Sequence, residues 1–103
     1  MGYRISQGAE ADVDEIFLGW AERAGTKVAD RIVDEIVERF RLLGEFPEAG
    51  RSSNEIATGI KSFPAGKYLI YYRRSGEYTE ILHVFHGARE QARAFKKGRK
   101  VRR

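Results

Sequence analysis

The sequence predicts an α+β fold in the order β-α-α-β-β-β, with a helical hairpin packed on an antiparallel sheet. Two apolar runs, residues 67–73 and 79–86, are rich in the Tyr, Ile, Val and Phe that suit strands. Two longer segments, 9–24 and 26–43, instead repeat apolar residues at helical spacing. Because each helix carries one apolar stripe, the pair needs a sheet face on which to bury both stripes.

The first half of the chain predicts a short strand followed by two helices. Residues 3–6 alternate as a strand does, and residues 7–8 should end it. The stripe of the first helix is Val13, Ile16, Phe17, Trp20, Ala21 and Ala24, and that of the second is Ala29, Ile32, Val33, Ile36, Val37, Phe40 and Leu43. Gly25 suits the end of the first helix, Thr26 can cap the second, and Gly44 should stop it. Because the connection around Gly25 is so short, the two helices should fold back on each other as an antiparallel pair.

The second half predicts a loop and three antiparallel strands. A loop over 47–54 precedes a weaker strand over 56–63, and 64–66 makes a turn. The two apolar runs then pair as a hairpin about the break at 74–77. In the last strand, one side should carry Ile81, His83 and Phe85, and the other Leu82, Val84 and His86. Apolar residues on both sides indicate that both sheet faces are at least partly covered.

The chain has the length of one domain, and its charge is uneven. We assign residues 1–95 to a single domain, with a short helix over 88–95, and residues 96–103 to a basic C-terminal tail. The last eight residues hold six of the nineteen Lys and Arg side chains, which leaves thirteen bases against fifteen acids elsewhere. Such a tail can contact an anionic partner such as DNA, and a solvated terminus explains it equally well.

Composition narrows the function classes. The chain has no Cys, so it can form neither a disulfide nor a thiolate metal site. Its two His residues lack clustered carboxylates, so we expect no metal site, and nothing in the sequence indicates a cofactor. No apolar run approaches the roughly 18 residues of a membrane span, and the N-terminus lacks the apolar centre of a signal peptide. We therefore expect a cytoplasmic protein with no membrane partner.

Four segments carry a family resemblance: AEADVDEIFLGW (9–20), FPEAGR (46–51), GIKSFPAGKYLIYYR (59–73) and ILHVFHGAR (81–89). In this order and spacing they resemble the RelE/ParE superfamily of toxins from bacterial type II toxin–antitoxin pairs. The resemblance implies a small toxin that a cognate antitoxin keeps silent. RelE-like members cut mRNA on the ribosome, whereas ParE-like members act on DNA gyrase. The His-Gly-x-Arg ending and the FPEAGR loop are more similar to the ParE branch.

Metal-free RNA cleavage would need a base for the 2′-hydroxyl, a cation beside the phosphate and an acid for the leaving oxygen. Suitable types are present, with His83, His86, Glu80 and Tyr72 as acids or bases and Arg51, Lys61, Arg73 and Arg89 as cations. However, His83 and His86 lie three positions apart and should face opposite sides of a strand. The run 67–73 also has bases only at its ends, which suits contact with a protein better than with RNA.

We therefore favour a ParE-like toxin that disables gyrase by contact, with no catalytic residue of its own. The alternative is a RelE-like mRNA endoribonuclease that depends on the ribosome, and a third option is an inactive relative that serves only as an interaction module. The residues expected to contact the target or the antitoxin are Arg51, Tyr72, Arg73, His86, Arg89 and Arg93. Structural alternatives stay open, because Arg51 can tie its loop down, Tyr72 can belong to the core and Arg89 can form an ordinary ion pair. His83 fits a hydrogen-bonded core histidine better than a proton shuttle.

Overall fold

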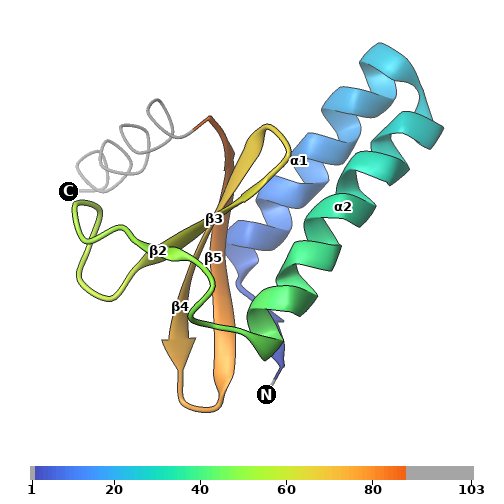
Figure 1. The fold of residues 1–103 in the computed structure, drawn as a ribbon. Helices are drawn as coiled ribbons and strands as arrows, with labels where there is room; N and C mark the ends of the chain where they lie inside the picture. Colours follow the sequence, from blue (N-terminus) through green and yellow to red (C-terminus); the bar gives the residue numbers. More distant parts are fainter. Residues whose placement is uncertain (1, 88–103) are drawn as a thin grey trace.

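The computed structural model describes residues 2–87, and Figure 1 shows its two helices lying together on one side of a sheet. The elements are β1 (Tyr3–Ile5), α1 (Gln7–Ala24), α2 (Thr26–Glu45), β2 (Arg51–Ser52), β3 (Lys61–Ala65), β4 (Tyr68–Ser75) and β5 (Tyr78–His86). Arg89, Arg93, the helix predicted over 88–95 and the basic tail lie outside the described residues. No helix within residues 2–87 is both long and apolar enough to cross a membrane.

The strands form one mixed sheet in the order β1-β5-β4-β3-β2. This confirms the α+β class and the helical hairpin on one sheet face. The sheet is not wholly antiparallel, because β1 runs parallel to β5. A parallel pair needs a long crossover connection, which α1, α2 and the strands β2–β4 supply. The pairing of β2 with β3, through Arg51 and Ser52, lies in a segment predicted to be a loop.

α1 begins two residues earlier than its apolar pattern predicts, because Ser6 caps it. The Ser6 Oγ accepts a hydrogen bond from the Ala9 N–H and donates one to the Leu82 carbonyl, both at 3.0 Å. Gly8, expected to break the chain, lies inside the helix against the ring of His83. A Cβ added at Gly8 would lie 2.8 Å from Cε1 of His83. Close packing, and not a turn, therefore accounts for this glycine.

The apolar stripe of α2 is the main helical contribution to the core, and four of its residues are buried: Ala29, Ile36, Phe40 and Leu43. Gly25 joins the helices with a φ of 93°, which a side chain would disfavour, and Thr26 is the first helical residue and not the cap. The helix continues through Gly44 to Glu45. Gly44 does not end the helix. Its lack of a side chain is explained by close packing, because a Cβ added at Gly44 would lie 2.9 Å from the carbonyl carbon of Gly2.

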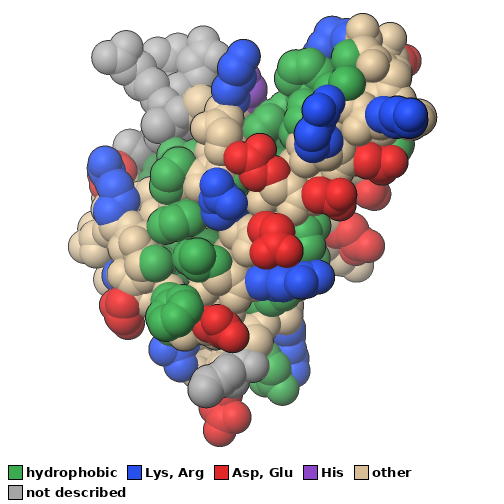
Figure 2. Space-filling view, turned by 45° about the vertical axis from the view of Figure 1, so that its right-hand side comes forward, with side chains coloured by type: hydrophobic (Ala, Val, Ile, Leu, Met, Phe, Trp, Pro, Cys, Tyr) green, Lys and Arg blue, Asp and Glu red, His purple; other side chains and the backbone are tan. Residues whose placement is uncertain are grey.

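The outer face of the hairpin carries charges of both signs, which Figure 2 shows as interleaved red and blue side chains. On α2, Arg39 pairs with Glu35 and Arg41 with Glu38, each at 3.6 Å. Exposed ion pairs one helical turn apart add only a few tenths of a kcal/mol, roughly 0.3–0.5 kcal/mol each. This face is therefore a solvated surface.

β3, β4 and β5 form the predicted antiparallel meander with shifted boundaries. β3 begins at Lys61 and runs through Pro64 and Ala65, so the predicted strand over 56–63 is placed too early. The turn to β4 lies at Gly66, whose φ is 62°. Pro64 is compatible with a strand here because β2 is only two residues long and leaves this part of β3 at the sheet edge.

One extra residue in β5 changes which side chains share a face. Leu82 has no partner in β4, because its neighbours Ile81 and His83 pair with adjacent β4 residues. Ile81 and Val84 consequently join the same core cluster, while Leu82 packs on the opposite face. The prediction that Ile81 and Val84 face opposite sides is wrong, because it assumes an uninterrupted strand.

The sheet has apolar cover on both faces, as its composition indicates. The cluster beneath the helices contains Ala9, Ile36, Phe40, Leu43, Ala65, Ile70, Tyr72, Ile81 and Val84. A smaller cluster on the other face contains Ile56, Ile60 and Tyr71, with Ala57, Leu69, Leu82 and Phe85 packed against it. The loop between β2 and β3 supplies Ile56 and Ile60, so this loop covers part of the face that the helices leave open.

Candidate partner-binding groove

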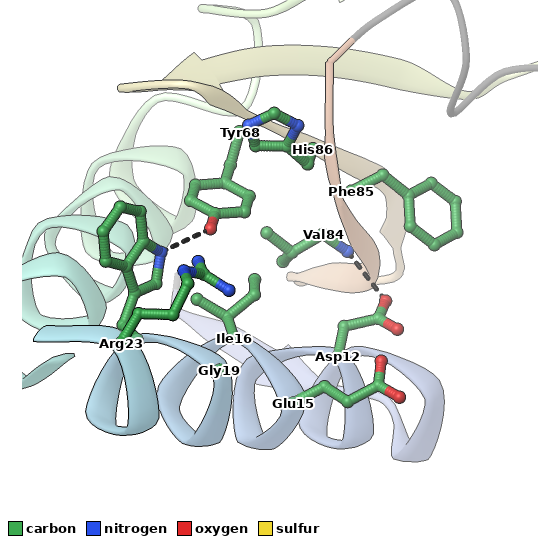
Figure 3. Close-up of a pocket in the computed structure, with 10 residues that line it drawn as sticks. Asp12, Glu15, Ile16, Gly19, Arg23, Tyr68, Val84, Phe85 and His86 are labelled. Atoms are coloured by element: carbon green, nitrogen blue, oxygen red, sulfur yellow. Dashed lines mark hydrogen bonds between the residues drawn. The ribbon is translucent and has the colours of Figure 1, made fainter.

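A groove of about 530 Å³ separates α1 from the start of β4 and the end of β5. Figure 3 shows its residues: Asp12, Glu15, Ile16, Gly19, Trp20, Arg23, Tyr68, Val84, Phe85 and His86. The α1 members recur every three or four positions, so they form one stripe along the helix. From Asp12 to Arg23 this stripe rises about 16 Å, roughly three turns.

The rings of Trp20, Tyr68 and His86 form an aromatic wall at one end of the groove. Nε1 of Trp20 donates a hydrogen bond to the Tyr68 hydroxyl at 2.8 Å, and a dashed line in Figure 3 ends on the labelled Tyr68. The Arg23 guanidinium lies 4.6 Å from the centre of the Trp20 ring, and His86 meets the edge of Tyr68 at 5.2 Å between centroids. Cation–π and edge-to-face contacts of this kind fix ring orientation as well as burying apolar area. The wall therefore joins α1 to the ends of both central strands.

Asp12 closes the other end of the groove and completes the edge of β5. β1 ends at Ile5, so beyond Ile81 the edge of β5 lies against α1 instead of a strand. One Asp12 carboxylate oxygen accepts a hydrogen bond from the Val84 N–H at 2.9 Å and another from Nδ1 of His83 at 2.8 Å. An acid at this position therefore has a structural role. In the sequence, this role could have been found from the position of Asp12, an acid directly beside the apolar stripe of the first helix.

His83 is a hydrogen-bonded, partly buried histidine, as its apolar flanks predict. Its ring also stacks on Phe85, with 4.9 Å between centroids and 17° between planes. His86, by contrast, is exposed and lines the groove on the helix side. The two histidines therefore do not share one site, as their spacing predicts.

Tyr72 is the predicted contact residue that the structure buries completely, with 0% of its surface exposed. Its hydroxyl donates a hydrogen bond to the Pro47 carbonyl and accepts one from the Gly50 N–H, both at 2.8 Å. Burial raises the pKa of this hydroxyl, against the smaller lowering by the Gly50 N–H. Tyr72 thus anchors the loop between α2 and β2, and a partner has no access to it.

Arg51, Arg73 and His86 are exposed but do not converge. Arg51 lies on the two-residue edge strand β2. Arg73 forms an ion pair with Glu80 at 2.9 Å across β4 and β5. His86 pairs with Tyr68 at the opposite end of β4 from Arg73, five residues or about 17 Å along the strand. Lys61 pairs with Glu48 at 3.5 Å. Within residues 2–87, no three His, Asp or Glu side chains come together in a way that could hold a metal ion.

A family model described as "ParE toxin of type II toxin-antitoxin system, parDE" matches residues 3–91, nearly the whole chain. The chain belongs to the ParE toxin family. This family assignment places it among the toxins of type II toxin–antitoxin systems and confirms the ParE branch that the sequence resemblance favours.

Curated relatives of the ParE family match most of the chain. Toxin ParE3 of Caulobacter vibrioides is 32% identical over 76 residues, which cover 74% of this chain and 76% of that protein. Toxin ParE1 of the same organism is 29% identical over 84 residues, which cover 82% of this chain and 86% of the relative. Toxin ParE1 of Mycobacterium tuberculosis is 29% identical over 85 residues, with 82% and 87% covered.

A solved structure shares the fold of this ParE-family chain. It is a chain of the "Chromosomal ParDE TA system from P. aeruginosa", which superposes with a TM-score of 0.76 at 21% sequence identity. The match covers 85% of this chain and 97% of the other. At this identity the likeness concerns the fold, and it agrees with the helical hairpin and sheet seen here.

Proposed function

We propose that this ParE-family toxin inhibits DNA gyrase by binding it, without bond chemistry, and that a cognate antitoxin neutralises the toxin by occupying the groove beside α1. The family assignment supports a toxin–antitoxin partnership. The structural neighbour is named as a ParDE toxin–antitoxin system, which supports the same partnership. The groove supports a protein ligand, because it combines an aromatic wall with a few charged groups at its ends.

The observation that carries the non-catalytic proposal is the separation of the candidate reactive groups. RNA cleavage requires an acid or base and a cation within about 3 Å of one scissile phosphate. Arg73 lies about 17 Å along β4 from the residue that pairs with His86, and it is held by Glu80. His83 is bound to Asp12, and Tyr72 is buried. Arg73, His83, Tyr72 and His86 therefore do not meet around one phosphate, which supports inhibition by binding.

For the target contact we propose the basic tail together with Arg89 and Arg93. These residues concentrate positive charge at one end of a chain whose remainder is slightly acidic. Gyrase works on DNA, so a basic segment can engage either an acidic gyrase surface or the DNA that gyrase holds.

The decisive experiment compares two activities of the purified chain. We expect it to inhibit ATP-dependent supercoiling by gyrase and to leave mRNA on translating ribosomes uncut. Adding the polypeptide encoded beside this gene should restore supercoiling. Cut mRNA with unaffected supercoiling would overturn the proposal in favour of the RelE-like activity.

The tail is tested by a variant in which its six bases, within residues 96–103, are replaced by Gln. We expect gyrase inhibition to fall while binding of the antitoxin is kept. A control replaces Lys27 and Arg31, two exposed bases of α2, in the same way and should keep full inhibition. Undiminished inhibition by the tail variant would show that the tail is not the effector.

A further inference from the structure

Gly19 lies in the interior of α1 and lines the groove, as Figure 3 shows. A glycine in a helix interior destabilises the helix relative to alanine, because its backbone loses more conformational freedom on folding. A glycine at such a position therefore needs a reason, either in the packing of the chain itself or in the approach of another molecule.

The packing of the described chain supplies no such reason at Gly19. A Cβ added there would meet only Nη1 of Arg23 within 4 Å, at an ordinary contact distance of 3.5 Å and at the end of a flexible side chain. The other helical glycines differ: at Gly8 the added atom would lie 2.8 Å from His83, and at Gly44 it would lie 2.9 Å from the Gly2 backbone. Their absence of a side chain is required by contacts within the chain, and that of Gly19 is not.

Two charged side chains flank Gly19 along the same stripe of α1. Glu15 precedes it by one turn and Arg23 follows it by one turn, so the two charges are about 12 Å apart along the helix. Within residues 2–87 neither of them forms an ion pair, and Arg23 rests on the face of Trp20. The groove thus has an acid toward one end, a base toward the other and a bare backbone between them.

We propose that Gly19 is the point of closest approach for a helix of the antitoxin, which presents a small residue to Gly19, a base to Glu15 and an acid to Arg23. This inference rests on the proposed function, since it names how the antitoxin occupies the groove. Small residues allow two helix backbones to approach closely, and a stripe of three turns matches a helix laid along α1. Charge at both ends then fixes the register of the bound helix.

The test substitutes Gly19→Ala and measures stability and binding on the same protein. The melting temperature of the free toxin should rise by about 2–8 °C, because alanine favours the helix. Binding of the purified polypeptide encoded beside this gene, measured by calorimetry, should weaken by about tenfold or more, which corresponds to ~1.4 kcal/mol per tenfold. A more stable free toxin that binds its partner more weakly is the result that a contact between Gly19 and the partner predicts.

The matched control is Leu18→Ala on the same helix, because Leu18 is 62% exposed and lies outside the groove. It should leave the affinity unchanged within about twofold. A second arm, Glu15→Gln or Arg23→Gln, should weaken binding and reduce its dependence on salt. If wild type and Gly19→Ala bind equally well, the inference is overturned while the proposed function stands. If the wild-type chain does not bind that polypeptide, the antitoxin proposal fails, and this inference fails with it.

Discussion

The hydroxyl of Tyr72 gives a quantitative test of how the loop between α2 and β2 is held. Tyr72→Phe keeps the buried ring and removes the two hydrogen bonds to Pro47 and Gly50. An unsatisfied buried polar group costs about 1–3 kcal/mol. Because both backbone groups are only partly buried, we take the lower end for each, or about 2 kcal/mol in total. The melting temperature should then fall by roughly 8–16 °C for a domain of this size.

The assay is guanidinium unfolding followed by circular dichroism, together with a thermal scan. The free energy of unfolding should fall at an unchanged denaturant slope, because the amount of surface exposed on unfolding is the same. Tyr78→Phe is the control, since Tyr78 is 41% exposed and packs under Arg4, so loss of its hydroxyl should change stability by less than about 0.5 kcal/mol. A similarly small effect at Tyr72 would refute the anchoring role.

Further outcomes follow from the same contacts. Burial raises the pKa of the Tyr72 hydroxyl, so the stability that this group contributes is present below pH 10.0 and is lost as pH rises through its folded pKa. Above pH 10.0, the free energy of unfolding should therefore fall less steeply with pH in Tyr72→Phe than in the wild type, as a series of unfolding curves would measure. Asp12→Ala should cost about 2 kcal/mol in denaturant unfolding, because Val84 and His83 lose their shared acceptor, and an equal stability would count against the edge-capping role. Gly8→Ala should lower the melting temperature of the wild type, and it should lower that of a His83→Ala variant much less if the ring contact is the cause.

The fold class followed from periodicity, because long stripes such as that of α2 leave few ways to bury their apolar face. The ends of the helices were harder to predict, because a glycine can either break a helix or allow close packing inside it. Gly8 and Gly44 looked like breaks in the sequence, yet both lie inside helices and are explained by a distant ring and a distant backbone. Contacts between residues far apart in the chain decide such cases, and a single sequence does not contain them.

The candidate site was only partly accessible from the sequence for the same reason. Trp20 and Tyr68 are 48 positions apart, and their hydrogen bond forms only once α1 lies across the sheet. Tyr72 is also a tyrosine of β4, like Tyr68, but its hydroxyl forms its hydrogen bonds with the loop between α2 and β2. Residue type made Tyr72 a predicted contact residue, but the direction of each side chain decides that Tyr68, and not Tyr72, reaches the groove.

The bulge at Leu82 decides which histidine the groove receives. Ile81 is fully buried on the helix side. In an uninterrupted strand, residues two and four positions further on would share that side, which would place His83 and Phe85 beneath α1. The extra residue reverses this alternation, so Val84 enters the core and His86 meets Tyr68 in the groove. His83 is left at the strand edge, where Asp12 binds it. A single inserted position in β5 therefore gives the groove an exposed imidazole beside its aromatic wall and assigns the other histidine to structure.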